Sequence, residues 1–469
     1  MAMTEPDQRH IWTRSFDGRF RLRHTPDHAA PVAATVSFDR WDPTSLDVQL
    51  VFPAESRSLI HEILRVSGGD IVEVVPVNKA MPTVELIGTR GGFLSDHKGT
   101  IRTDSLRVGL GSGSEAHDRT THVRVQMQPS GILAPHEGVE HHFTGEIKVT
   151  PWDEAAAIVR TKFGSLEVRR AYHYSSGERH GDRVTHQIER ACIMGEVACP
   201  AGTSFHSLHE ELSQDFDDIC ILLSLTYRQP VQYYQVEYDH FGEEHQHGLV
   251  RHRWHRIRPT LNEPELIGQR QLVRGGLQAL LDNFRSTAEQ RTVRRAITFL
   301  AASYSASLES AYFMAFSALE TVANAALPAD ARLVVPSSQW KKIERKLTAS
   351  VQDIGQEFNL SEAVVQSMRD KLPELKRPVL GLRVKKACAA HDVSTERLWP
   401  DLSFEDGVAR AIAVRNDLFH AANALSASVL YGDLVRVQTL CERILLGVLH
   451  WPNDKRFELC DELLARVNC

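Results

Sequence analysis

The chain has 469 residues, 42% of them hydrophobic and 24% charged, with a formal net charge of −6 at pH 7. This composition is ordinary for a globular protein of roughly two to four domains, and it excludes a uniformly basic nucleic-acid coat. Seven cysteines without a C-x-x-C spacing argue against a disulfide framework, so we expect a protein of the reducing cytoplasm. The chain begins without an apolar signal core and contains no apolar run long enough to span a bilayer, so we expect no membrane partner.

Short runs of alternating apolar and polar residues follow one another through the first 200 residues. Alternation with a period of two places side chains on the two faces of a strand, and these runs are rich in β-branched residues. Because turn residues separate them, we expect an antiparallel sandwich or barrel-like domain. The clearest runs are 20–24, 34–38, 46–52, 71–75, 123–127 and 166–169.

Helical spacing interrupts these strands in places. We expect helices at 55–66 and 153–162, and a longer one over 204–227 that Ser204 would cap. Two strand-like stretches, 231–238 and 250–257, follow the longer helix. Together these segments define a β-rich N-terminal domain over residues 1–260.

The segment between those last two strands is polar and rich in histidine. His240, His245 and His247 lie within it, and His252 and His255 follow. Clustered His and Glu side chains can bind zinc, so a metal-dependent hydrolase using the His240–His255 cluster is one alternative. Since no helix-borne H-x-x-x-H spacing accompanies the cluster, a solvated loop is the favoured interpretation.

From about residue 262 the spacing of apolar residues becomes helical. We therefore expect an all-α bundle over residues 262–469, which makes the whole chain an α+β protein. The expected helices are 272–284, 293–301, 308–323, 340–351, 363–372, 404–420, 429–449 and 457–467.

A basic segment precedes the motif-bearing helix. Residues 338–389 hold eleven Lys and Arg residues against six acidic ones, although the whole chain is acidic. Such a segment can track the phosphates of a structured RNA, or it can be the solvated face of a surface helix. Its densest part is the candidate RNA-binding set Lys341, Lys342, Arg345 and Lys346.

The helix over 404–420 ends in the run Arg415-Asn416-Asp417-Leu418-Phe419-His420. At about 100° per residue, Ile412 and Phe419 share one line of this helix, and Val414 and Leu418 form a second apolar face. A helix that is apolar on two sides must bury one side in its own domain and the other against something else. We therefore expect a homodimer, or a larger even oligomer, with two such helices in contact.

Arg415, Asn416 and His420 carry the chemistry in this helix. His420 can accept or donate a proton, and Arg415 can hold two phosphate oxygens. Asn416 lies four residues before His420, one helical turn away, where its amide can orient the imidazole. Arg415 and His420 diverge by about 140°, so a cleft shared with a second helix suits them better than a cleft within one chain. Glu320 interrupts a strongly apolar helix and is a candidate partner for Arg415 or for another arginine of the bundle.

The order Arg, polar residue, short spacer, His on a late helix of an all-α domain resembles the active motif of HEPN ribonucleases. Arg415, Asn416 and His420 match that motif position by position. A domain of this kind behind a β-rich N-terminal half is similar to the ApeA-type anti-phage proteins. The resemblance is specific over residues 262–469 and weak over 1–260.

The resemblance implies a metal-independent endoribonuclease without cofactors, a homodimeric hydrolase whose Arg and His residues cleave RNA through attack by the ribose 2′-OH. It further implies a toxin or an antiviral defence effector acting by abortive infection, with tRNA or another structured RNA as substrate and a phage-derived trigger. The N-terminal domain would then be the sensor or regulator. Besides the metal-dependent hydrolase, a non-catalytic helical dimer that binds nucleic acid or a nucleotide is the alternative.

Overall fold

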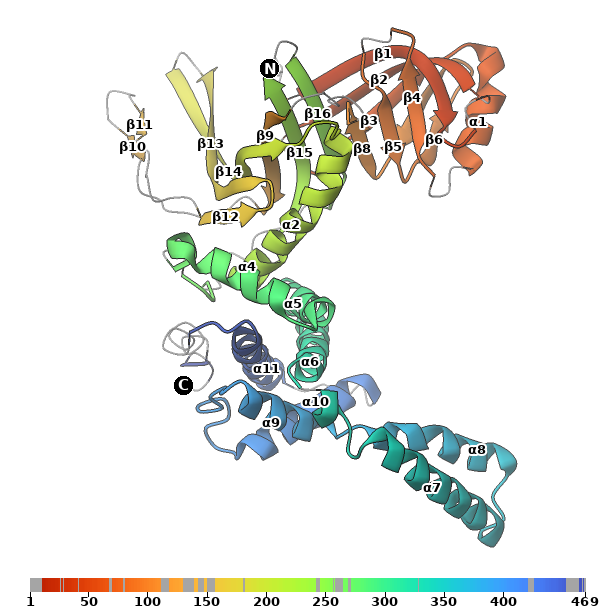
Figure 1. Cartoon of the computed structure of the whole chain (residues 1–469), viewed down its shortest axis with the longest axis vertical. Helices are drawn as coiled ribbons and strands as arrows, with labels where there is room; N and C mark the ends of the chain where they lie inside the picture. The colour runs from red at the N-terminus through yellow and green to blue at the C-terminus, as the bar shows by residue number, and fades with distance from the viewer. Residues whose placement is uncertain are drawn as a thin grey trace. The chain divides into compact units, whose positions relative to one another are not determined.

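Figure 1 shows the computed structural model of the chain. The structure describes the backbone alone for residues 66, 90–93, 139–141, 147–149, 170–179, 182–190, 245, 329–330 and 419–420. The residues that it describes are 11–25, 27, 29–40, 42–66, 70–78, 81–110, 118–129, 139–141, 147–149, 157–179, 182–241, 245–255, 257, 265–268, 271–327, 329–420, 426–452, 464–465 and 467.

The chain folds into two compact units. The first comprises Met1–Leu223, Pro230–Pro259 and Gly268–Gln278, and the second comprises Ser224–Gln229, Thr260–Ile267 and Ala279–Cys469. The boundary therefore crosses two helices, α2 (Phe205–Thr226) and α4 (Leu277–Ser286). The coarse architecture is α+β, with a large antiparallel sheet followed by a helical region.

The first unit is built on one continuous sheet of fourteen described strands, all paired antiparallel, in the order β12-β13-β14-β9-β15-β16-β8-β5-β4-β1-β2-β3-β7-β6. A separate pair, β10 and β11, stands outside it. The described strands thus form one continuous antiparallel sheet and one separate pair. Their bounds are β1 Ile11–Leu22, β2 Ala29–Asp39, β3 Asp47–Val51, β4 Val72–Pro76, β5 Val84–Ile87, β6 Arg90–Leu94, β7 Lys98–Arg102, β8 Ser105–Val108, β9 Arg119–Gln128, β10 Val139–His141, β11 Ile147–Val149, β12 Ala157–Thr161, β13 Gly164–Arg179, β14 Asp182–Cys199, β15 Gln232–Phe241 and β16 His245–His252.

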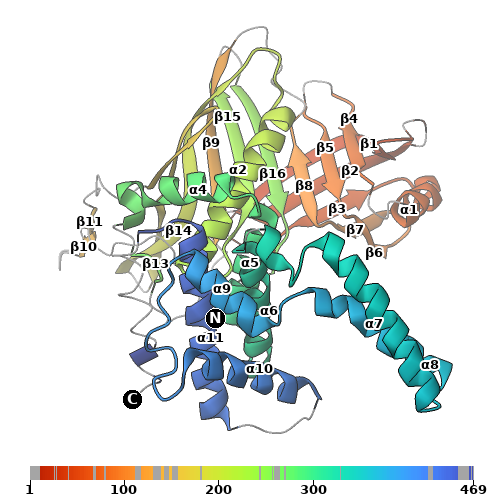
Figure 2. The same cartoon turned by 60° about the horizontal axis from the view of Figure 1, so that its bottom comes forward.

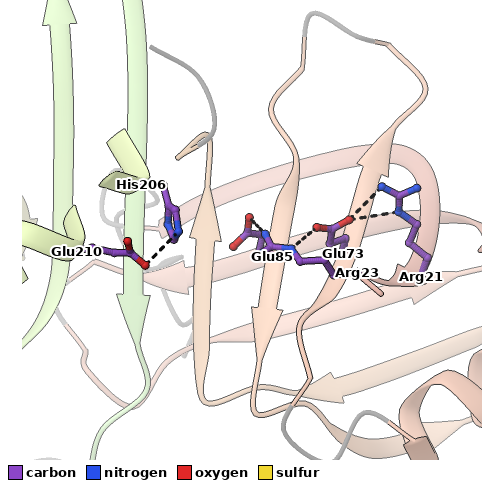
Figure 3. Close-up of polar contacts among 6 residues, drawn as sticks. All are labelled: Arg21, Arg23, Glu73, Glu85, His206 and Glu210. Atoms are coloured by element: carbon purple, nitrogen blue, oxygen red, sulfur yellow. Dashed lines mark hydrogen bonds and ion pairs between the residues drawn. The ribbon is translucent and has the colours of Figure 1, made fainter. Parts of the chain in front are cut away.

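Alternation builds the core of this unit, as the sequence predicts. Phe16, Phe20, Val36, Val48 and their neighbours on β1 to β5 and β8 are buried together, with α1 (Arg57–Val66) packed on the same core. The opposite face carries charges: Arg21 and Arg23 pair with Glu73, and Arg23 also pairs with Glu85 (Figure 3). One face of these strands is therefore apolar and buried, and the other is an ion-pair network.

Two sequence-based expectations for this unit are wrong. The helix expected at 153–162 is a strand over Ala157–Thr161, where Ala157 and Val159 are buried and Ile158 is exposed, a period of two. The described part of the histidine-rich segment extends two paired strands, β15 and β16: Asp239, His240 and Phe241 lie opposite His247, Gln246 and His245. The helix over 204–227 is confirmed as α2, and the Ser204 hydroxyl accepts a hydrogen bond from the amide of Ser207 at 3.2 Å.

The helices of the second unit pack around α11 (Ala427–Val448), nearly every residue of which is buried from Leu430 onward. Beside it lie α5 (Gln290–Ser303) and α6 (Leu308–Ala325), both expected from the sequence. No described helix in either unit is both long and apolar enough to cross a membrane. The remaining described elements are η2 Ala54–Ser56 in the first unit, η3 Leu272–Gly276 at the boundary, and in the second unit η4 Ala329–Arg332, α7 Ser337–Glu357, α8 Glu362–Lys371, η5 Leu372–Lys376, α9 Leu380–Ala390 and α10 Phe404–His420.

Buried ions on α11 are paired. Glu442 accepts two hydrogen bonds from Arg228, Nε to Oε1 at 2.6 Å and Nη2 to Oε2 at 2.8 Å, and the Tyr304 hydroxyl also donates to it. Asp433 accepts from both Arg410 and Arg436. These pairs satisfy charges that would otherwise be costly in a buried helix.

Two helices form a hairpin that extends away from the rest of this unit. Figures 1 and 2 show α7 and α8 side by side, apart from α10 and α11. The helix α9 was not expected from the sequence, because Pro378 and Pro400 suggested a loop. Pro378 instead precedes the first turn of α9, where proline is compatible with a helix. The terminal helix expected at 457–467 lies largely outside the described residues.

Candidate active site

The motif helix α10 spans Phe404–His420, as the sequence predicts. Ser403 caps its first turn: the Ser403 hydroxyl accepts from the amide of Asp406 at 3.1 Å and donates to the Asp406 carboxylate at 2.7 Å. Glu405 and Asp406 in the first turn favour the positive end of the helix dipole. Gly407 lies directly against Trp399, where a Cβ would stand 2.3 Å from the indole, so this contact requires glycine.

One face of α10 is packed into the bundle. Val408, Ala411 and Val414 are buried, and the Tyr312 hydroxyl of α6 donates to the carbonyl of Ala411 at 3.0 Å. Ile412 and Leu418 are only half-buried. Each of the two apolar lines expected from the sequence therefore has a partly exposed member, Ile412 in the first and Leu418 in the second, whose other member Val414 is buried. The Phe419 side chain lies outside the described residues.

Arg415 lies at the edge of the packed face and reaches toward α6. Its guanidinium carbon stands 5.5 Å from the centre of the Phe316 ring, and Nη2 lies 4.0 Å from Oε1 of Glu320. Nη1 also donates to Oδ1 of Asn416 at 3.2 Å. The expected pairing of Glu320 with Arg415 is therefore present, and a cation–π contact adds to it.

The charge of Glu320 also acts on a second arginine, Arg383. Asn324, one turn further along α6, accepts a hydrogen bond from Nη1 of Arg383 at 2.7 Å. Partial burial lowers the pKa of Arg383, and the negative charge of Glu320 opposes that shift. Arg383 and Asn324 were missed by the sequence reasoning. The i, i+4 spacing of Glu320 and Asn324 on an apolar helix was the available signal.

The structure tests only part of the motif. Asn416 is exposed, and its amide oxygen faces Arg415. The helix α10 ends at His420, and the structure describes the backbone but not the side chain of this residue. The expected orientation of His420 by Asn416 therefore stays a prediction.

A partly apolar cavity of about 350 Å³ opens beside the C-terminal turns of α10. Phe313 is 44% exposed there, although most of the apolar residues of α6 are buried. An exposed phenylalanine next to a half-buried leucine on the motif helix is the kind of surface that a second protein chain covers. The lining residues are Glu309, Ser310, Tyr312, Phe313, Met314 and Leu418.

The basic candidates lie on a different element from the motif. Lys341, Lys342, Arg345 and Lys346 are all exposed on α7, in the hairpin. At about 100° per residue, Lys341 and Arg345 share one line of the helix, and Lys342 and Lys346 share another. The patch therefore has two sides that can be mutated separately.

The histidine-rich cluster does not form a metal site among the described side chains. His247 Nδ1 is 2.8 Å from Asp239 Oδ1, and His240 Nδ1 is 2.8 Å from the carbonyl oxygen of Thr120. No group of three or more His, Cys, Asp or Glu with metal-binding geometry occurs in the described part of the chain. Residues 242–244 and the side chain of His245 lie outside it.

A polar concavity in the first unit was also missed by the sequence reasoning. It measures about 680 Å³, lies on β9 and its neighbouring strands, and includes Arg124, Glu196 and the exposed ring of Phe241. Most of its acidic and basic groups already pair with one another, for example His122 with Glu196 at 3.4 Å. Alternate positions of several strands contribute to it, so no single stretch of sequence marks it.

Comparison with known proteins adds no relative: no family model matches the chain, and no curated protein or solved structure shows significant similarity to it.

Proposed function

We propose that this protein is a metal-independent endoribonuclease of the HEPN type, with Arg415 and His420 as its catalytic residues. The observation that carries the proposal is the environment of Arg415. Its guanidinium is half-exposed at the end of a well-packed helix and is oriented by Phe316 and Glu320. An arginine held in this way can exchange a weak, solvated ion pair for a phosphate.

The chemistry requires only proton transfer and charge stabilisation, because RNA carries its own nucleophile. A neutral His420 would accept the proton of the ribose 2′-OH, or a protonated His420 would donate to the departing 5′-oxygen. Arg415 would hold two non-bridging phosphate oxygens as negative charge develops on them. The products would carry a 2′,3′-cyclic phosphate and a 5′-hydroxyl.

A second copy would complete the cleft. Positions 415 and 420 of a regular helix lie about 140° apart, an arrangement that suits a cleft shared by two copies better than one within a single copy. The exposed Phe313 and the half-buried Leu418 supply apolar surface for contact between two motif helices. The resulting dimer would use Arg415 and His420 from both copies.

The substrate and biological role rest on the basic segment and on the family resemblance. Lys341, Lys342, Arg345 and Lys346 offer an exposed basic surface for a structured RNA such as a tRNA. A toxin or anti-phage effector, with the first unit as its sensor, is the role that the ApeA-type resemblance favours.

The test is RNA cleavage by purified protein with and without EDTA, with the product ends identified. Arg415→Ala and His420→Ala should each abolish cleavage, while Asp417→Asn, an exposed neighbour on α10, should retain it. Co-purified mixed dimers of the two Ala variants should regain part of the activity, because one intact Arg415 and one intact His420 remain. A folded His420→Ala protein that cuts at the wild-type rate would refute the assignment, as would 5′-phosphate products. An RNA-binding protein that never cleaves would instead be the non-catalytic dimer.

A further inference from the structure

The α7–α8 hairpin has a small core of its own. The two helices run antiparallel: Gly355 lies against Val365, and Arg369 of α8 donates to Gln352 of α7. Only a few side chains are shared between them, so much of each helix surface remains uncovered. The core consists of Val351, Val365 and Leu372, with Leu347 and Leu360 packed against it.

Uncovered apolar residues gather on one side of this hairpin. Ile343 and Ile354 lie about 20° apart on α7, and Val364 and Met368 lie about 40° apart on α8. On each helix, the exposed pair lies roughly 80° around the helix axis from the buried core positions. Viewed from the N-terminus of each helix, this rotation has the same direction. Because the helices are antiparallel, these equal displacements bring both pairs to the same side. All four side chains are exposed, and Phe358 at the hairpin turn is 65% exposed.

A row of charges borders this apolar face along the outer edge of α7. Lys342 and Lys346 occupy the half of the helix near the bundle, and Asp353 and Glu357 occupy the half near the turn. All four are exposed, and within the described part of the chain their side chains form no hydrogen bond or ion pair. The row is therefore positive at one end, negative at the other, and unpaired along its length.

We propose that the exposed face of the α7–α8 hairpin binds the same face of a second copy of this chain, with the two α7 helices antiparallel. In that arrangement a twofold axis between residues 349 and 350 places Lys342 opposite Glu357 of the second copy. The same axis places Lys346 opposite Asp353. One twofold axis thus satisfies both charge pairs, and the symmetry-equivalent pairs bring the total to four ion pairs.

The apolar residues fit the same axis. Phe358 of one copy lies two residues, about 3 Å along the helix, from the level of Ile343 of the other. Ile354, Val364 and Met368 add to a shared seam between the two hairpins. The product is a four-helix bundle, a common way for two helical hairpins to bury apolar faces. A nucleic acid would use Lys342 and Lys346 but would leave the apolar side chains and the acids in water, so a second copy suits the whole face better. In this assembly Lys341 and Arg345, on the other side of α7, remain exposed for RNA.

This interface is separate from the motif-helix contact and does not depend on the proposed ribonuclease activity. Together the two contacts would build an even oligomer larger than a dimer. Each contact can be broken without the other, so their failures can be told apart. Phe313→Asp lies on the motif-helix side, and the hairpin variants lie on α7.

The experiment is sedimentation equilibrium on full-length, RNA-free protein. Lys342→Glu with Lys346→Glu should halve the assembly mass, as should Asp353→Lys with Glu357→Lys. An equimolar mixture of these two variants should regain the wild-type mass, because the first presents only acids along the edge and the second only bases. The variant carrying all four changes should also assemble, since its charge row is merely reversed.

A matched control uses the other side of the same helix. Lys341→Glu with Arg345→Glu makes the same change in net charge away from the apolar face and should leave the mass unchanged. A wild-type protein that is monomeric at tens of micromolar would overturn the proposal. So would unchanged masses for both charge-reversed variants, whatever Phe313→Asp does.

Cross-linking gives a second measurement that does not depend on tolerance of charge reversal. Ser350 lies next to the proposed axis, so Ser350→Cys should form a disulfide-linked dimer under mild oxidation. Gln356 is exposed, lies about 120° around α7 from Ser350 and would stand about 20 Å along the helix from its own symmetry mate. Gln356→Cys should therefore not form a disulfide-linked dimer, and neither should the wild type. Equal cross-linking of the Ser350→Cys and Gln356→Cys variants would overturn the assigned face and register.

Discussion

Arg415 of α10 and Glu320 of α6 form an ion pair with 4.0 Å between Nη2 and Oε1, although 95 positions separate them in the chain. Both side chains are more than a third exposed, 35% and 39% respectively, so the pair is screened by water and contributes little to stability. Its consequence is orientation: Glu320 and the Phe316 ring together restrict where the guanidinium points.

We predict that Glu320→Gln lowers kcat for RNA cleavage by roughly 10- to 100-fold, because a misplaced arginine stabilises the transition state poorly. KM should change little, since the basic segment and not Glu320 would bind most of the RNA. Glu405→Gln is the matched control, because Glu405 is an exposed, ion-paired carboxylate on α10, ten residues before Arg415 and outside the motif. Single-turnover kinetics would measure both effects, and an unchanged kcat would show that Glu320 does not position Arg415.

We predict that replacing Lys341, Lys342, Arg345 and Lys346 by Ala weakens RNA binding and reduces its dependence on salt. Each lost phosphate contact removes roughly 0.7 to 0.9 from the slope of log K against log[salt]. Filter-binding or fluorescence titrations at several salt concentrations would measure the slope. Testing the pair Lys341 and Arg345 separately from the pair Lys342 and Lys346 would show which side of α7 faces RNA. Affinity and slope both equal to the wild type would leave the patch without an RNA role.

We predict that Glu442→Gln strongly destabilises the second unit. The Arg228 and Glu442 side chains are 0% and 1% exposed, so the variant leaves a buried guanidinium without its counter-ion, at a cost of roughly 3–5 kcal/mol. Thermal unfolding followed by circular dichroism would show the lowered Tm. Glu405→Gln, which breaks the exposed pair with Lys385, is the control and should leave Tm unchanged. Equal Tm values for Glu442→Gln and the wild type would contradict the paired-ion interpretation.

We predict that His209 makes the first unit less stable in acid. Burial lowers the pKa of His209 to about 3, with the charges of His252 and Arg107 adding to the shift, while its Nδ1 shares a 2.8 Å hydrogen bond with the Tyr238 hydroxyl. The unfolded chain therefore binds a proton below about pH 6.5 that the folded chain does not bind until about pH 3. The stabilisation is complete above about pH 6.5 and is lost progressively as the pH falls, by up to about 1.4 kcal/mol per pH unit.

The measurement is the slope of unfolding free energy against pH in the mildly acidic range. His209→Gln should flatten that slope, because its amide can still hydrogen-bond to Tyr238 but does not titrate. His206→Gln is the control: His206 is half-exposed on the same helix and pairs with Glu210 at 3.3 Å (Figure 3). If both variants keep the wild-type slope, His209 is not the titrating group.

Local periodicity explains what could be predicted from the sequence. The alternation in β1 to β4 and the helical spacing over 404–420 both depend on residues a few positions apart, so the faces of these elements follow from neighbouring side chains. For the same reason Arg415, Asn416 and the basic residues of α7 could be identified before their surroundings were known. Prediction failed at Ala157–Thr161 and in the histidine-rich hairpin, where short segments do not distinguish strand from helix or loop.

Long-range pairing was decided only by the tertiary structure. The strand β9 pairs with β14 on one side and with β15 on the other. The alternation of residues within β9 does not identify either partner. Arg228 reaches Glu442 across 214 positions, yet any acid of the bundle was an equal candidate from the sequence. The exposed apolar side of the α7–α8 hairpin can likewise be identified only from the packing, which shows the part of α7 that α8 covers. A sequence specifies which faces must be buried, but the choice of partner depends on packing among all the elements at once.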